Sequence, residues 1–274
     1  MTARRVIVSG ADAGYFRYLK HAAESVRAQD PDRNTALVLL DLGLETVQRD
    51  ELAGIADAIV EPGWDYDLPD RDTLPSHWRA YTARPHLPSH VPGFDLYMWL
   101  DADARVQQWD AIERFFAAAG DEAGGARKVA IVPEVHPTYR NQHHARGEFE
   151  GVIHAAFESA FGADVAQHLY RKPHLNTGAF ALAADAPHWC AWSKALRRAL
   201  VDRGSRERLA EQCAMNVVVY EEGLPAAFLE PRCNWICHHA APRFDPDSGL
   251  LTEPLAPFAP LGIVHETMWS KSAP

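Results

Sequence analysis

Short apolar runs alternate with longer segments of helical periodicity over the first part of the chain. Residues 4–10, 35–41 and 56–62 are rich in aliphatic and β-branched side chains, as strands covered on both faces would be. Between the first two runs, residues 15–29 place apolar side chains three or four positions apart, which predicts an amphipathic helix. Residues 46–55 predict a shorter helix. Strands that alternate with helices indicate an α/β fold with a mostly parallel sheet and right-handed crossovers.

The pattern continues after a long connection. Residues 62–93 are rich in Pro, Trp, Asp and His and are expected to be partly helical, whereas the polar residues 135–148 are expected to form a functional excursion. Apolar runs predict further strands at 97–106, 128–134, 176–183 and 261–266. Helical spacing predicts helices at 109–119, 151–161, 187–202 and 207–221.

Two carboxylates, Asp101 and Asp103, follow the apolar run LYMWL. In open α/β sheets, ligands bind beyond the carboxyl ends of the strands, which is where these two residues are expected to lie. Positions i and i+2 of an extended segment point the same way, so both carboxylates can face one cation. Few hard oxygen ligands, with room left for phosphates, are typical of Mg²⁺ or Mn²⁺ sites. The pair can equally be a capped strand end followed by a turn, and D-x-D alone is a weak signal.

Composition limits the possible partners. With 27 basic and 37 acidic residues the formal charge is −10, which argues against nucleic acid or an anionic membrane. No apolar run approaches the length of a membrane span or of a secretory signal, so we expect a cytoplasmic protein without a span. The spacing C-x-x-x-C-H-H at 233–239 lacks a second ligand pair at zinc-finger distance, and the cysteines are too scattered for a disulfide framework: Cys190, Cys213, Cys233 and Cys237.

Five short motifs resemble, in the same order, those of GT-A fold glycosyltransferases of family 8, which includes glycogenin and bacterial lipopolysaccharide galactosyltransferases. They are ADAGY for D-x-x-Y, LDAD for D-x-D, LNTGAFAL for N-[AS]-G, EQCAMN for D-Q-D-x-L-N and HETMWSK for H-F-x-G-x-x-K. The resemblance implies a GT-A (Rossmann-like) nucleotide-diphospho-sugar transferase fold, with a mixed, mostly parallel central sheet flanked by helices. We expect one domain over 1–274, with a nucleotide-binding half at about 1–133 and an acceptor-side half at about 134–274.

The resemblance implies specific contacts to the nucleotide and the metal. Asp12 and Tyr15 would hold the base, and Arg84, 17 positions before Asp101, would contact donor phosphate or sugar. The three metal ligands would be Asp101, Asp103 and His265, with Asp101 also contacting the donor. The expected cation is Mn²⁺ or Mg²⁺.

Further residues are implied around the donor sugar and the diphosphate. Asn176 and Gly178 would line the sugar, and Glu211 and Gln212 would lie beside the reacting carbon. Lys271, six residues after the histidine of the last motif, would contact the diphosphate. The amide oxygen of Gln212 could serve as the electron-rich group that an oxocarbenium-like sugar requires.

The function implied is metal-dependent, retaining transfer of a hexose from a nucleotide diphosphate sugar, UDP-linked, to a hydroxyl acceptor, either a saccharide or a small molecule. The chain departs from the family pattern with a glutamate at Glu211, a cysteine at Cys213, a methionine at Met268 and a serine at Ser272. Two alternatives remain. A metal-dependent nucleotidyltransferase or phosphohydrolase could use the same aspartates, although SGADAGYFRY lacks the Gly-rich, basic loop of sugar nucleotidyltransferases. The substitutions could also mark an inactive nucleotide-sugar-binding homologue.

Overall fold

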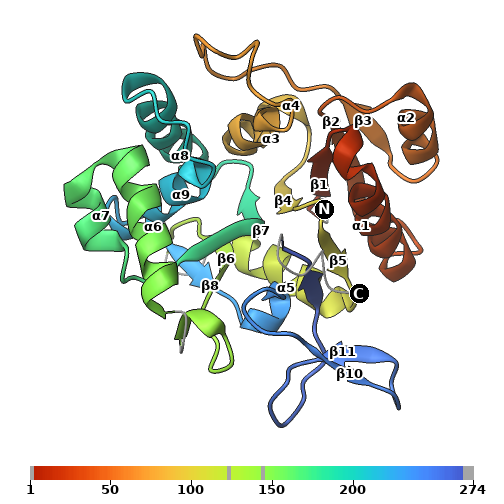
Figure 1. Cartoon of the computed structure of the whole chain (residues 1–274). Helices are drawn as coiled ribbons and strands as arrows, with labels where there is room; N and C mark the ends of the chain where they lie inside the picture. Colours follow the sequence, from red (N-terminus) through yellow and green to blue (C-terminus); the bar gives the residue numbers. More distant parts are fainter. Residues whose placement is uncertain (1–2, 122–124, 143–145, 268–274) are drawn as a thin grey trace.

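A seven-stranded sheet forms the centre of the computed structural model, which describes residues 3–121, 125–142 and 146–267 (Figure 1). The strand order is β3-β2-β1-β4-β7-β6-β8. Every neighbouring pair is parallel except those that β7 makes with β4 and β6, so β7 alone runs against the other strands of this sheet. The mixed, mostly parallel sheet predicted from the sequence is therefore confirmed. Its strands are β1 Arg5–Ala11, β2 Ala36–Asp41, β3 Ala58–Val60, β4 Leu96–Leu100, β6 Val129–Pro133, β7 Leu175–Ala183 and β8 Ala226–Phe228.

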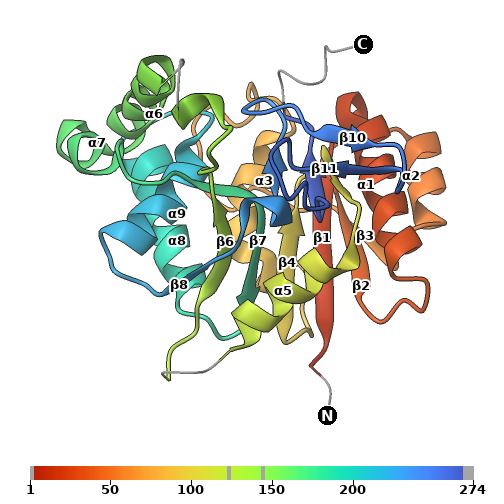
Figure 2. The same ribbon diagram turned by 90° about the horizontal axis from the view of Figure 1, so that it is seen from below.

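Helices cover both faces of this sheet, and strand alternation separates two cores (Figure 2). On β1, Val6 and Val8 face one core while Ile7 faces the other, as period-2 geometry requires. The Ile7 core packs against α1 Phe16–Gln29, α2 Thr46–Ala53 and α5 Trp109–Gly120. The other core receives α3 Trp78–Ala83, α4 Leu87–His90, α6 Arg146–Phe161, α7 Ala163–Leu169, α8 His188–Arg197 and α9 Ala210–Tyr220.

A second, three-stranded sheet joins the middle of the chain to its last described strand. It has the order β5-β12-β9, with β5 Ala104–Val106, β12 Ile263–His265 and β9 Trp235–Ile236. The sequence predicted 97–106 as one strand, but the chain turns at 101–103, where the Ala104 N–H donates to the Asp101 carbonyl at 3.0 Å. The turn places β5 beside β12 in antiparallel register, with His265 opposite Ala104. The long-range pairing of β5 with β12 therefore brings His265 to the two aspartates.

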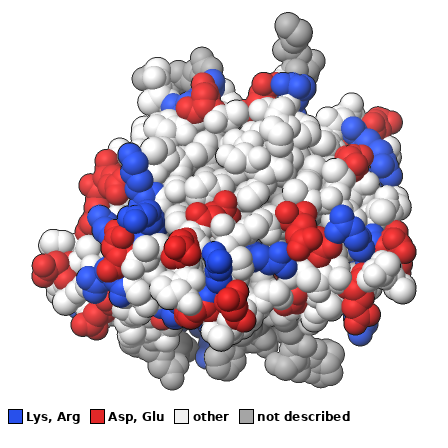
Figure 3. Space-filling view, turned by 90° about the horizontal axis from the view of Figure 1, so that it is seen from above, with Lys and Arg blue, Asp and Glu red and all other residues white. Residues whose placement is uncertain are grey.

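The remaining elements are short. The predicted helix 187–202 ends as a π-helical turn at Arg198–Asp202, and a hairpin of β10 Arg243–Asp245 and β11 Leu250–Thr252 projects from the body (Figure 1). No helix in the described part of the chain combines the length and apolar character needed to cross a bilayer. On the face in Figure 3, basic and acidic side chains intermix around an uncharged area, so its described residues form no continuous basic stripe. The 3₁₀ turns are Ala13–Tyr15, Arg84–His86, Arg140–Gln142 and Pro231–Cys233.

Candidate functional site

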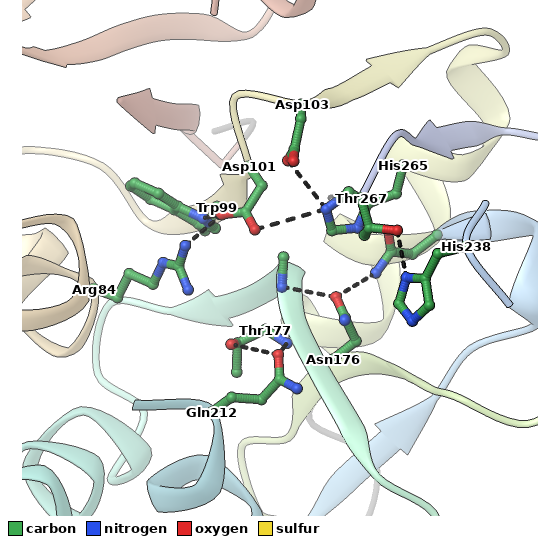
Figure 4. Close-up of polar contacts among 12 residues, drawn as sticks. Arg84, Trp99, Asp101, Asp103, Asn176, Thr177, Gln212, His238, His265 and Thr267 are labelled. Carbon is green, nitrogen blue, oxygen red and sulfur yellow. Dashed lines mark hydrogen bonds and ion pairs between the residues drawn. The ribbon is translucent and has the colours of Figure 1, made fainter. Parts of the chain in front are cut away.

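Asp101, Asp103 and His265 converge where the two sheets meet (Figure 4). One ligand atom from each lies within 4.8 Å of the others. His265 Nε2 is 3.2 Å from Asp103 Oδ1 and 3.7 Å from Asp101 Oδ2. Burial would lower the pKa of His265, but the carboxylates of Asp103 and Asp101 outweigh it and raise the pKa, so the cluster attracts positive charge. Two carboxylates and an imidazole are a donor set that fits Mn²⁺ or Mg²⁺.

A bulge in β7 brings its backbone against this cluster. Between the pairs Val132–Asn176 and Ile131–Phe180, the register with β6 shifts, and residues 177–179 lie between those pairs. The Asp101 N–H donates to the Gly178 carbonyl at 2.7 Å. A Cβ on Gly178 would lie only 2.3 Å from His265 Cε1, so this position requires glycine for close approach.

Arg84 contacts Asp101 Oδ1, the carboxylate oxygen that does not face His265. Its guanidinium pairs with Asp101 and with Glu211 Oε2, the latter at 2.6 Å, and stacks over Trp99 at 4.7 Å from the ring centroid. The Trp99 indole N–H also donates to Asp101 Oδ1, at 2.7 Å. These contacts occupy Oδ1 and leave Oδ2 facing His265. Arg84 was expected to contact the donor, and it does line the smaller of the two pockets described below, but its terminal nitrogens bind carboxylates.

Thr177 contacts both Glu211 and Gln212, the two residues expected beside the reacting carbon. The Thr177 hydroxyl lies 3.1 Å from Glu211 Oε2. The Thr177 N–H donates to Gln212 Oε1 at 3.2 Å (Figure 4). Glu211 is buried, and its Oε1 has no hydrogen-bond partner. Burial raises the pKa of Glu211 to about 7 against the opposing effect of Arg84. Of the pair, Gln212 lines the larger of the two pockets described below, and Glu211 lines neither of those two.

Two pockets meet at the aspartates. The smaller, of about 210 Å³, is lined by residues that follow β1 and by residues of the 77–84 region, among them Asp12, Tyr15, His77, Tyr81 and Arg84. The larger, of about 620 Å³, is lined among others by Glu134, Asn176, Gln212, His238, His239 and His265. Asp101, Asp103 and Arg208 line both. A ligand in one pocket would therefore reach the same two carboxylates as a ligand in the other.

The residues expected to hold the base, Asp12 and Tyr15, line the smaller pocket. Asp12 Oδ1 accepts from the N–H groups of Gly14 and Tyr15, at 3.1 and 3.3 Å, which caps the turn before α1. Tyr15 is 40% exposed, so its ring is accessible to a ligand. Lys271, expected at the diphosphate, lies outside the described residues.

The sequence matches no protein-family model and no curated protein. The structure does match solved ones. The galactosyltransferase LgtC, in complex with donor and acceptor sugar analogs, gives a TM-score of 0.53 at 16% identity, over 95% of this chain and 86% of that chain. Mouse xyloside xylosyltransferase 1 gives 0.53 at 14% identity over the whole of both chains. Core-mannan synthase A from Aspergillus fumigatus, in its Mn/GDP form, gives 0.50 at 7% identity, over 83% and 73%.

The chain has a glycosyltransferase GT-A fold. The fold predicted from the motifs is thereby confirmed. Within this GT-A fold, the three residues predicted as metal ligands lie close together. In the sequence, His265 follows Asp103 by 162 positions and Asp101 by 164 (265 − 103 and 265 − 101).

Sequence reasoning missed four residues that surround the site of this GT-A fold: Trp99, Glu134, Asn234 and His239. Trp99 precedes Asp101 by two positions, so strand periodicity alone puts both on one side. Glu134 follows β6 at the same sheet edge as Asp101 follows β4, which is a usable signal. Asn234 and His239 lie in irregular segments. His239 ends the C-x-x-x-C-H-H spacing, which was considered only as a zinc site, and nothing local in the sequence marks Asn234.

Proposed function

We propose that this chain is a metal-dependent, retaining glycosyltransferase that moves a hexose from a UDP-sugar to a hydroxyl acceptor. The observation that carries the proposal is the meeting of Asp101, Asp103 and His265 at the junction of two pockets. A donor and an acceptor that occupy adjoining pockets would meet beside the groups that hold the cation. Similar folds bind sugar analogs in LgtC and Mn/GDP in core-mannan synthase A, which supports the same class of ligands here.

The smaller pocket is proposed to take the nucleotide. Its lining by Tyr15, Tyr81 and His77 offers aromatic faces for a base, and Asp12 offers a carboxylate there. A Mn²⁺ or Mg²⁺ ion held by Asp101, Asp103 and His265 would supply positive charge to the departing diphosphate. Lys271 is proposed to add a further cationic contact there.

Gln212 is proposed to lie beside the reacting carbon of the sugar. Its Oε1 is held by the Thr177 backbone N–H, so the amide is oriented without a charged partner. An amide oxygen is electron-rich yet not basic, which suits stabilisation of positive charge on the sugar. An active-site glutamine is also the residue replaced by glutamate in a solved LgtC mutant. Asn176 and Gly178 are proposed to line the sugar, and Glu211 to act through Arg84.

The larger pocket is proposed to take the acceptor, a saccharide or small molecule with a free hydroxyl. Its volume of about 620 Å³ is within the range of small-molecule sites, roughly 300–1,000 Å³. It combines polar groups such as Gln212 and His238 with the apolar Ile153 and Leu209. A ring with one apolar and one hydroxyl-bearing face matches such a lining.

The test is a screen of UDP- and GDP-sugars with Mn²⁺, with release of free nucleotide diphosphate and the configuration of the product measured. Slow hydrolysis of one UDP-sugar, lost in Asp103→Asn but kept in Asp67→Asn, supports the proposal; Asp67 is a matched control because its side chain is 97% exposed. Pyrophosphate release from a nucleoside triphosphate and a sugar phosphate would instead indicate a nucleotidyltransferase, and release of inorganic phosphate from phosphate esters a phosphohydrolase. Binding without turnover would indicate an inactive homologue.

A further inference from the structure

A buried chain of hydrogen bonds connects His265 to Glu134 through two asparagine side chains. His265 Nδ1 lies 3.1 Å from Asn234 Oδ1, Asn234 Nδ2 donates to Asn176 Oδ1 at 2.9 Å, and Asn176 Nδ2 donates to Glu134 Oε1 at 2.7 Å. All four residues are less than 9% exposed, and they come from four separate segments of the chain. We call these four residues the relay.

The direction of the relay is fixed independently at two points. The backbone N–H of Gly178 can only donate, and it lies 2.9 Å from Asn176 Oδ1, so the oxygen of this amide must be on that side. The NH₂ group of Asn176 then points to Glu134. Burial opposes ionisation of Glu134, but the hydrogen bond from His239 and its charge lower the pKa of this carboxyl to about 2, so Glu134 only accepts. The contact with Gly178 and the contact with Glu134 therefore give the same orientation of the Asn176 amide.

This orientation determines which nitrogen of His265 carries a hydrogen. Because Asn234 donates to Asn176 with its NH₂ group, only its oxygen is left to face the imidazole. An oxygen can only accept, so Nδ1 of His265 must be the N–H nitrogen. A neutral imidazole with hydrogen on Nδ1 has its lone pair on Nε2, the atom that faces Asp101 and Asp103.

We propose that Glu134 is a positioning residue that fixes the tautomer and ring orientation of His265 through Asn176 and Asn234. The inference rests on the proposed metal-binding role of His265. Ligating histidines depend on an acceptor at their second nitrogen, and loss of such an acceptor costs about 10- to 100-fold in metal affinity. Here the negative charge that supports the imidazole lies three side chains away, on the wall of the acceptor-side pocket.

The decisive variant is Glu134→Gln, with Mn²⁺ binding measured by electron paramagnetic resonance in the absence of any sugar donor. The amide carries no charge, and its NH₂ group replaces one of the two oxygens that face Asn176 and the ring of His239. We expect the affinity for Mn²⁺ to fall about 10- to 100-fold. The matched control is His239→Gln, which changes the partner of the other Glu134 oxygen but keeps a donor there, and we expect its affinity to stay within about twofold of wild type.

A second variant moves the charge along the relay. In Glu134→Gln/Asn176→Asp, the new amide donates to the new carboxylate, which still accepts from Gly178 and Asn234. We expect Mn²⁺ affinity to recover to within a few-fold of wild type, an outcome that does not follow if Glu134 is only a packing residue. The ¹⁵N shifts of His265 in the Mg²⁺-loaded protein should report hydrogen on Nδ1 in wild type and in the double variant.

Three results with the variants would overturn the inference. They are wild-type Mn²⁺ affinity in Glu134→Gln, an equal loss in His239→Gln, and failure of the double variant to recover. These results differ from failure of the proposed function, in which the wild-type protein itself would bind no Mn²⁺. Absence of Mn²⁺ binding by wild type would also end the inference, because no ligand would then be positioned.

Discussion

The backbone of Gly178 lies so close to His265 that a single added carbon would occupy space held by the imidazole ring. The predicted Cβ of any other residue would be 2.3 Å from His265 Cε1 and 2.9 Å from Asp101 Oδ2. The absence of a side chain at the glycine of the N-T-G segment is therefore required for the close approach of β7 to His265 and Asp101. It connects two motifs that lie 87 positions apart (265 − 178).

Gly178→Ala should displace His265 and weaken Mn²⁺ binding at least tenfold. Because β7 is buried along its length, the overpacking should also lower the free energy of unfolding by about 1–3 kcal/mol. Isothermal titration with Mn²⁺ and urea unfolding measure the two effects. Gly63→Ala is the control, since nothing lies within 4 Å of its added carbon, and it should change stability by less than about 0.5 kcal/mol. Unaltered Mn²⁺ affinity in Gly178→Ala would mean that His265 is not a ligand.

Mn²⁺ should raise the melting temperature of the wild-type protein, and EDTA should reverse the effect. A ligand at about 100 times its dissociation constant stabilises the native state by about 2.7 kcal/mol when it binds only that state. His265→Gln and Asp103→Asn should lose most of this stabilisation, whereas Asp67→Asn should keep it. Differential scanning fluorimetry measures the shift, and equal shifts in all four proteins would contradict the assignment.

Gln212→Ala should lower kcat about 100-fold, the cost expected when one group that stabilises transition-state charge is lost. The KM for the donor should change only a few-fold, since Gln212 contacts neither the nucleotide pocket nor the three cation ligands. Steady-state kinetics with the donor identified in the screen measures both. Gln29→Ala, on the exposed last turn of α1, is the control. A rise in KM alone would assign Gln212 to binding instead.

Glu211 should make stability depend on pH near neutrality. Its pKa is raised by burial to about 7 in the folded protein, above its ordinary value of 4.5, so the folded state holds a proton that the unfolded state has lost between these values. The free energy of unfolding should therefore fall as pH rises from about 5 to about 7, by an amount on the order of 2 kcal/mol. Urea unfolding of wild type and Glu211→Gln at both pH values measures the difference. A variant that shows the same slope as wild type would assign the dependence to another group.

The sequence predicted the elements of the fold better than their direction. The runs that became β1 and β2 and the helix α1 have clear periodicity, and each was found close to its predicted bounds. A strand buried on both faces reads the same in either direction, so the reversal of β7 left no local signal. The strand predicted at 97–106 divides at the D-A-D turn because β5 pairs with β12, a contact between distant segments.

In the candidate site too, residues marked by short motifs could be predicted, whereas contacts between distant segments could not. Asp101, Asp103 and His265 could be predicted because short motifs mark each of them, and the structure brings them together. The pairing of Arg84 with both Asp101 and Glu211 could not be predicted from the sequence, because it depends on how α3 and α9 pack at the carboxyl ends of the strands. The contacts expected for Lys271 stay a prediction.

The position of His265 at the end of β12 has a practical consequence for work with this protein. A purification tag joined after residue 274 would begin ten positions beyond a candidate cation ligand (275 − 265), and a polyhistidine tag there would compete for Mn²⁺. β1 begins at Arg5, and this amino end of the strand is the end away from the site (Figure 2). An amino-terminal tag is therefore the suitable choice for every metal titration described above.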